Sequence, residues 1–92
     1  MAKKLGADLK RSTSTLPEAL GAELTDRRTK AGWSQQAVAD SLGYDVNYIG
    51  QLERAEKSPT LGTLISISTL FKIRLSEFLR AAEERVPKIR AR

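Results

Sequence analysis

The sequence predicts a compact all-α fold of five short helices, on three observations. Leucine, isoleucine and valine recur three or four residues apart, which is the spacing of one helix face. Glycine, proline and capping residues divide these apolar stretches into short segments. No segment alternates apolar and polar residues as a strand does. A chain of 92 residues is long enough for one small domain with a modest core.

The first helix is expected over residues 16–31, with Thr15 in a capping box at its start and Gly32 at its end. An arginine continues its leucine stripe at every fourth residue: Leu16, Leu20, Leu24 and Arg28. An arginine in line with three leucines requires a buried acidic partner, because an unpaired charge is costly to remove from water.

Two shorter helices are expected next, over residues 35–42 and 46–55. Ser34 and Asp45 are well placed as their N-caps, and Gly43 ends the first because it can adopt the left-handed conformation. The apolar positions that hold the two helices together are Val38, Ala39, Leu42, Ile49 and Leu52. Two short helices locked across a glycine turn make a helix-turn-helix.

This motif covers residues 35–54, and its second helix keeps one side free of the core. That outer side suits the major groove of DNA. It carries Val46, Asn47, Gly50, Gln51 and Arg54.

Two further helices complete the domain. Thr60 is a plausible N-cap for a helix over 61–71, which is apolar on nearly all sides and should therefore be central to the core. Ser76 is the expected N-cap of the last helix. That helix should finish near Arg85, because Pro87 disfavours helix at the residue before it.

The net charge of +5 lies at the two ends of the chain. Residues 1–15 hold four basic groups and one acidic group, and residues 80–92 hold five and two, whereas residues 16–79 hold seven and eight. We therefore expect a flexible basic arm over 1–15, a helix-turn-helix domain over 16–85 and a basic tail over 86–92. A basic balance fits a nucleic-acid partner, although solvated tails rich in lysine and arginine are the alternative.

Composition argues against catalysis and against a metal site. The chain has no cysteine and no histidine, which excludes Ser-His and Cys-His catalysis and removes the commonest metal ligands. No pair of carboxylates or glycine-rich phosphate loop stands out. We expect no enzyme activity, no metal and no cofactor. No apolar run approaches the ~20 residues of a membrane span, and the N-terminus lacks the apolar core of a signal peptide.

Three stretches carry a resemblance to a known family: Gly32-Trp33-Ser34-Gln35, Val38-Ala39-Asp40 with Leu42-Gly43, and Ile49-Gly50-Gln51-Leu52-Glu53-Arg54. Over residues 18–79 the chain resembles the lambda-repressor-like, XRE-type helix-turn-helix family, which includes phage repressors, Cro proteins and restriction-modification controller proteins. The resemblance implies a five-helix DNA-binding domain. With no signal peptide or membrane span in view, we expect a cytoplasmic, nucleoid-associated protein of bacterial or phage origin. Some members serve instead as adaptors or antitoxins.

Val46 and Asn47 match the family's first base-contacting positions, and Gln51 lies one turn further along the same face. Asparagine and glutamine amides can hydrogen-bond both N6 and N7 of adenine, whereas valine can only touch a thymine methyl group or fill space. The alternative is that these residues merely occupy the first turns of a surface helix.

Four residues are expected to contact the DNA backbone: Gln35, Tyr48, Arg54 and Lys57. The resemblance implies that Gln35 touches a phosphate and also braces the recognition helix. A phenol such as Tyr48 can donate to a phosphate oxygen, or it can pack against the first helix instead. Arg28 and Glu53 match the family's partly buried ion pair, which would hold the recognition helix to its scaffold.

One such domain contacts only a few base pairs, so we expect a homodimer on a near-palindromic operator. The expected interface lies in the last helix, at Leu75, Phe78, Leu79 and Ala82, with Val86 and Ile89 as its continuation. The alternative is that these side chains close the bundle. The leading interpretation is a sequence-specific transcriptional repressor or activator; the alternative is a protein-interaction module such as the antitoxin of a toxin-antitoxin pair.

Overall fold

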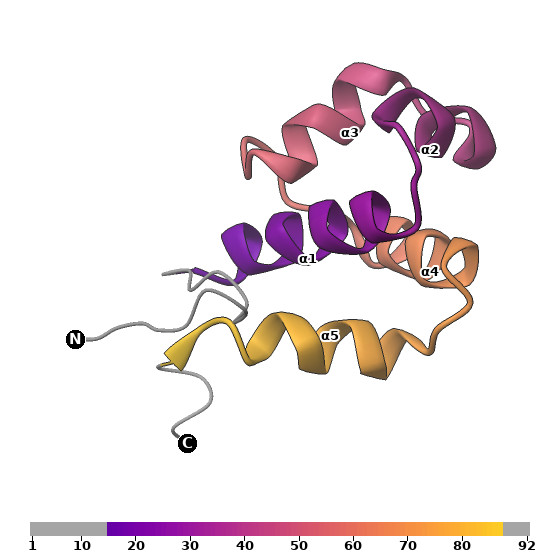
Figure 1. Ribbon diagram of the computed structural model, residues 1–92. Helices are drawn as coiled ribbons and strands as arrows, with labels where there is room; N and C mark the ends of the chain where they lie inside the picture. The colour runs from indigo at the N-terminus through magenta and orange to yellow at the C-terminus, as the bar shows by residue number, and fades with distance from the viewer. Residues whose placement is uncertain (1–14, 88–92) are drawn as a thin grey trace.

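The computed structural model describes residues 15–87, and in this part of the chain it contains five helices and no strand (Figure 1). The all-α five-helix class is therefore confirmed for the described residues. The predicted arm, apart from Thr15, and residues 88–92 of the predicted tail lie outside them. The helices are α1 (Leu16–Lys30), α2 (Gln35–Leu42), α3 (Val46–Glu53), α4 (Leu61–Leu70) and α5 (Leu75–Glu83).

Four of the five predicted N-caps are present. Each cap side chain accepts a hydrogen bond from a backbone N–H in the first turn; at Asp45 the distance to the N–H of Asn47 is 2.7 Å. The four caps are Thr15, Ser34, Asp45 and Thr60. The prediction for Ser76 is wrong, because α5 begins at Leu75 and the N-cap position belongs to Arg74, whose side chain makes no capping bond.

The C-terminal ends follow two patterns. Gly32 and Gly43 adopt positive φ angles of 78° and 75°, as expected where α1 and α2 end. After α3 and α4, however, the left-handed residues are Ala55 and Lys72, both at φ 60°. Left-handed backbone after Arg54 ends α3 at Glu53, so the predicted helix over 46–55 was too long. The turn at Ala55 folds the chain back, so that the N–H of Glu56 donates to the carbonyl oxygen of Gln51 at 2.8 Å.

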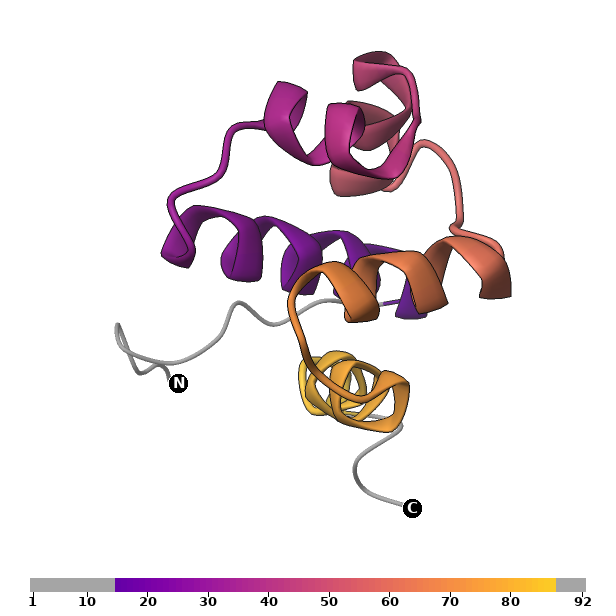
Figure 2. The same cartoon turned by 90° about the vertical axis from the view of Figure 1, so that its right-hand side faces the viewer.

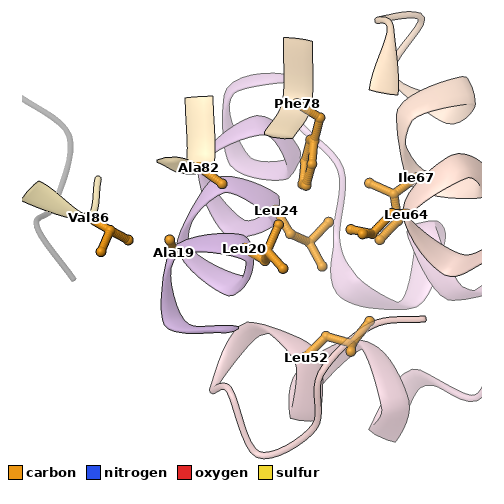
Figure 3. Close-up of a cluster of buried hydrophobic side chains, with 9 residues drawn as sticks. All are labelled: Ala19, Leu20, Leu24, Leu52, Leu64, Ile67, Phe78, Ala82 and Val86. Carbon is orange, nitrogen blue, oxygen red and sulfur yellow. The ribbon is translucent and has the colours of Figure 1, made fainter. Parts of the chain in front are cut away.

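Helix α1 is the central element of the bundle. Helices α2 and α3 lie on one side of it and α5 on the other, as the two views at right angles show (Figures 1 and 2). The main core fills the space between α1, α3, α4 and α5 (Figure 3). It consists of Ala19, Leu20, Leu24, Leu52, Leu64, Ile67, Phe78, Ala82 and Val86.

A second cluster holds the helix-turn-helix together. Val38 and Ala39 of α2 and Ile49 of α3 are completely buried against one another. Trp33 and Phe71 close the edge of this cluster, with ring centroids 6.3 Å apart and planes at 70°. The apolar residues identified in the sequence therefore do lock α2 to α3.

Two residues that follow α5, Arg85 and Val86, are packed against the domain. Val86 is only 3% exposed, and the Arg85 side chain is buried against α1. The guanidinium of Arg85 lies 3.0 Å from Glu23 Oε1, and Arg27 donates to Glu23 Oε2 at 2.7 Å. Arg85 was expected inside the domain, and the burial of Val86 adds the first residue of the predicted 86–92 tail to the packed part of the chain.

Helices α1 and α3 approach each other most closely at Gly21. A Cβ atom at this position would lie 2.5 Å from the carbonyl oxygen of Leu52 and 2.8 Å from that of Glu53. Glycine inside a helix is unfavourable by about 1 kcal/mol relative to alanine. Here the missing side chain lets the end of α3 rest directly on the backbone of α1.

We expect Gly21→Ala to destabilise the domain by about 2–3 kcal/mol, because the new methyl group meets backbone oxygens that cannot rotate away. Thermal and urea unfolding followed by circular dichroism measure this change. The matched control is Gly62→Ala in α4, where a Cβ has only an ordinary 3.8 Å contact with Thr60 Oγ1. The control should be neutral or stabilising by up to about 1 kcal/mol. Equal effects of the two substitutions would contradict the close α1–α3 contact.

Candidate nucleic-acid interface

Helix α3 lies at the outer edge of the bundle, on the side of α1 opposite α5 (Figures 1 and 2). Asn47 is exposed in its first turn, and Gln51, four residues later, is half-buried. This spacing places both amides on the same side of the helix. Val46 is also half-buried and packs against the α2–α3 cluster. The sequence-predicted base-contacting residues therefore lie together, with Asn47 the most accessible.

Gly50 does not form part of the open surface that the sequence suggested. It is buried, and the three atoms nearest to a Cβ at this position all belong to the guanidinium of Arg54, with Nη1 at 2.9 Å. The Arg54 side chain thus folds back over the recognition helix and covers Gly50.

Glu53, the last residue of α3, is the point where three helices are tied together. Arg28 of α1 donates to both of its oxygens, from Nε to Oε2 at 2.6 Å and from Nη2 to Oε1 at 3.1 Å. Gln35, the first residue of α2, donates to Oε1 at 2.8 Å. The Arg28 and Glu53 side chains are only 14% and 6% exposed. We call this set, Arg28, Gln35 and Glu53, the Glu53 clamp.

Arg28 also donates from Nη1 to the carbonyl oxygen of Trp33 at 2.9 Å. One guanidinium therefore donates both to a backbone carbonyl between α1 and α2 and to the Glu53 carboxylate of α3. The buried acidic partner that the leucine stripe predicted for Arg28 is therefore Glu53. The bracing part of the role expected for Gln35 is visible in its bond to Glu53.

Arg54 follows α3 and is paired with Glu56. Nε lies 2.8 Å from Oε2 and Nη2 lies 3.2 Å from Oε1, so the contact is bidentate. The hydrogen bond from Arg54 holds the pKa of Glu56 below its ordinary value, and the same bond raises the pKa of Arg54. Both side chains are more than half exposed, so such a pair adds little stability. No spacing rule pointed to Glu56 as the partner of Arg54. The neighbouring Lys57 is exposed, as expected.

Tyr48 packs inside the fold more than the phosphate-contact prediction assumed. Its side chain is half-buried against the main core, and its hydroxyl lies 3.1 Å from Thr63 Oγ1. Tyr44 meets Tyr48 edge to face, and its hydroxyl lies 3.4 Å from the same Thr63 oxygen. These contacts favour the alternative that Tyr48 packs inside the fold. Its hydroxyl meets Thr63 of α4, however, and not the first helix as expected. The contacts attach α3 to the start of α4.

The dimer surface predicted in the last helix needs a correction at two positions. Phe78 and Ala82 are both 0% exposed, because they fill the core between α5 and α1, so they offer no area to a second copy. Leu75 and Leu79 are half-buried against the same core. The large apolar side chains exposed on α4 are instead Leu61, at 63%, and Ile65, at 48%. Helix α4 is therefore not buried on all sides, as its composition had suggested.

Residues 24–78 match the sequence profile of the helix-turn-helix family HTH_3. The chain belongs to this family. The match runs from the middle of α1 into α5 and includes the whole α2–turn–α3 unit. It agrees with the XRE-type resemblance noted in the sequence.

Similar proteins are helix-turn-helix regulators by name. The chain is 33% identical over 70 residues to the HTH-type transcriptional regulator SutR of Escherichia coli (strain K12). The aligned residues cover 76% of this chain and 39% of SutR. It thus spans about two fifths of the length of the curated relatives it matches.

Among solved structures, the clp gene regulator ClgR of Corynebacterium glutamicum superposes with a TM-score of 0.70 at 28% identity, over 74% of this chain and 72% of that one. The restriction-modification controller protein C.AhdI of Aeromonas hydrophila gives 0.64 at 29% identity, over 67% and 94%.

Within residues 15–87, no three or more acidic side chains gather as metal ligands would. Across the same residues, no helix has the length and apolar character needed to cross a bilayer.

We expect Glu53→Ala to destabilise this helix-turn-helix domain by about 3–5 kcal/mol, enough to unfold much of it, because Arg28 would be left with a buried, uncompensated charge. Chemical unfolding monitored by Trp33 fluorescence measures the loss.

The informative companion is the double substitution Arg28→Met with Glu53→Leu. It removes both charges together, and it should recover much of the lost stability, since well-packed apolar replacements of a buried pair are often neutral or better. A melting curve of Glu53→Ala that coincides with wild type would contradict the clamp.

Proposed function

We propose that this chain is a transcriptional regulator that binds double-stranded DNA sequence-specifically by inserting α3 into the major groove. The observation that carries the proposal is the pair of amides, Asn47 and Gln51, on the outward side of a helix whose orientation is fixed by the Glu53 clamp. Base recognition needs side chains that can hydrogen-bond base edges from a rigid support, and this geometry supplies both.

The regulator role is supported by the similarity to SutR and ClgR, which are both named as regulators, and by the family match. As a DNA-binding protein it would act on the nucleoid in the cytoplasm. In this proposal Val46, Asn47 and Gln51 contact bases, and Gln35, Arg54 and Lys57 contact phosphates. Tyr48 could add a phosphate contact only through a hydroxyl that already bonds Thr63.

A homodimer is the second part of the proposal. One eight-residue recognition helix meets only a few base pairs, and two copies related by two-fold symmetry would double the contacts on a near-palindromic operator. Apolar side chains for an interface are available on α4, at Leu61 and Ile65, and more modestly on α5, at Leu75 and Leu79. The α4 pair lies one turn apart and is the more exposed of the two.

For DNA binding, Asn47→Ala and Gln51→Ala should each weaken binding to a preferred duplex by about 5- to 100-fold, because each removes a bidentate base contact. Binding to random-sequence duplex should change little, since that binding depends on phosphates. The preferred duplex is selected by the wild-type protein from a random library, and affinities are measured by fluorescence anisotropy at fixed salt. Ser41→Ala is the control, because it also removes an exposed polar group without a change of charge and lies on α2, outside the proposed base-contacting face.

Two results would count against sequence-specific binding. One is a selection that enriches no sequence. The other is weak binding that disappears near physiological salt and ignores both substitutions. In either case the helix-turn-helix would be a scaffold, and a protein partner would be sought by pull-down.

For dimerisation, Leu61→Ser together with Ile65→Ser should weaken self-association by about 100-fold or more, because four apolar side chains leave a two-fold interface at once. Thermal stability should hardly change, since both side chains are exposed in the monomer. Sedimentation velocity over a concentration series gives the dissociation constant. The control is Leu16→Ser, because Leu16 is also partly exposed, at 37%, but lies on α1.

A wild-type protein that stays monomeric at hundreds of micromolar would contradict the homodimer. Loss of the dimer on changing Leu75 and Leu79 alone, with the α4 variant still dimeric, would place the interface on α5.

A further inference from the structure

We infer that Glu56 is an autoinhibitory residue that masks Arg54 in the free protein, so that docking on DNA requires Arg54 to exchange the Glu56 carboxylate for a phosphate. This inference rests on the proposed DNA-binding function and adds a regulatory element to its surface. Three features of the structure support it: the bidentate pair, the place where the guanidinium lies, and the turn that brings Glu56 there.

The first feature is the chemistry of the pair. The planar guanidinium donates two parallel hydrogen bonds to Glu56, which is the same geometry with which arginine binds a phosphate. The carboxylate therefore occupies the donors that a DNA backbone would use. Glu56 is a carboxylate at neutral pH, and it offsets the charge of Arg54 where DNA approaches.

The second feature is position. In the paired state the guanidinium lies over Gly50, where Nη1 would be 2.9 Å from a Cβ. Gly50 falls between Asn47 and Gln51 in the sequence of α3, so the folded-back arginine lies against the helix that is proposed to enter the groove. The absence of a side chain at Gly50 lets the guanidinium approach the helix closely there. A duplex that approached α3 closely would have to displace it.

The third feature is the backbone. Ala55 adopts φ 60°, and the N–H groups of Glu56 and Lys57 both donate to the carbonyl oxygen of Gln51, at 2.8 and 3.3 Å. The chain is thus folded back at this point by backbone bonds. Glu56 is held next to the end of α3 whether or not Arg54 pairs with it, so the carboxylate stays available as a competitor.

The exposure of the pair makes the exchange reversible. Arg54 and Glu56 are 59% and 53% exposed, so solvent and salt screen their attraction, unlike that of the buried Arg28–Glu53 pair. A DNA phosphate can therefore replace the carboxylate with little loss of free energy. The mask lowers affinity in a salt-dependent way, without blocking binding.

The test compares DNA affinities of wild type and Glu56→Gln, using the duplex selected by the wild-type protein, by anisotropy from low to physiological salt. Glu56→Gln should bind about 2- to 5-fold more tightly at low salt, which is the range of an exposed ion pair. The advantage should shrink as salt rises, because salt screens the pair. Glu83→Gln on α5 is the matched control, since it makes the same change in net charge at an exposed site.

A second pair of variants shows whether Glu56 acts through Arg54. In an Arg54→Gln background, adding Glu56→Gln should leave affinity unchanged, because the partner it masks is gone. An equal gain with and without Arg54, or a gain matched by Glu83→Gln, would overturn the mask in favour of plain charge repulsion. No gain from Glu56→Gln, in a protein that does prefer its selected duplex, would also overturn it and leave the proposed function intact. If wild type selects no duplex, the proposed function and this inference fail together.

Discussion

The buried carboxylate of Glu53 is the interaction on which the working arrangement of this domain depends. Helix α3 has eight residues, and a helix this short is not stable alone in water. Its shape and direction must come from its neighbours. Glu53 supplies the tie, because it accepts bonds from α1 through Arg28 and from α2 through Gln35. Gly21 completes the contact by letting the last carbonyls of α3 rest on the backbone of α1.

Those contacts fix one end of α3, and other contacts fix its beginning. Asp45 caps the first turn, and Tyr48 attaches it to Thr63 of α4. The helix is thus held at both ends while its outward side, with Asn47, stays accessible. Base recognition requires this combination, because a side chain on a loosely held helix cannot meet a base edge with defined geometry.

Local physics was readable from the sequence, whereas a contact between distant segments was predicted only where the family resemblance supplied it, as for Arg28 and Glu53. Helix spacing and cap residues identified five helices and four of their N-caps, since these depend on neighbours within one turn. The arginine in the leucine stripe signalled a buried acid, and the family resemblance pointed to Glu53. Spacing left open whether Phe78 closes the bundle or meets a second copy, because an apolar face looks the same in sequence in both cases. Nor could spacing show that Arg85 reaches Glu23 across 62 residues.

Gly50 and Ala55 show why the outer surface was harder to predict than the core. Sequence rules treat a glycine inside a helix as a weakness and a left-handed residue as a position for glycine. Here the glycine receives the side chain of Arg54, and an alanine takes the left-handed turn.

The helical glycine at Gly50 and the left-handed alanine at Ala55 both lie near the end of the recognition helix. Natural sequences break local rules most often where function constrains them. The Arg54–Glu56 pair lies where these two departures meet, whereas the Glu53 clamp one residue earlier serves the scaffold.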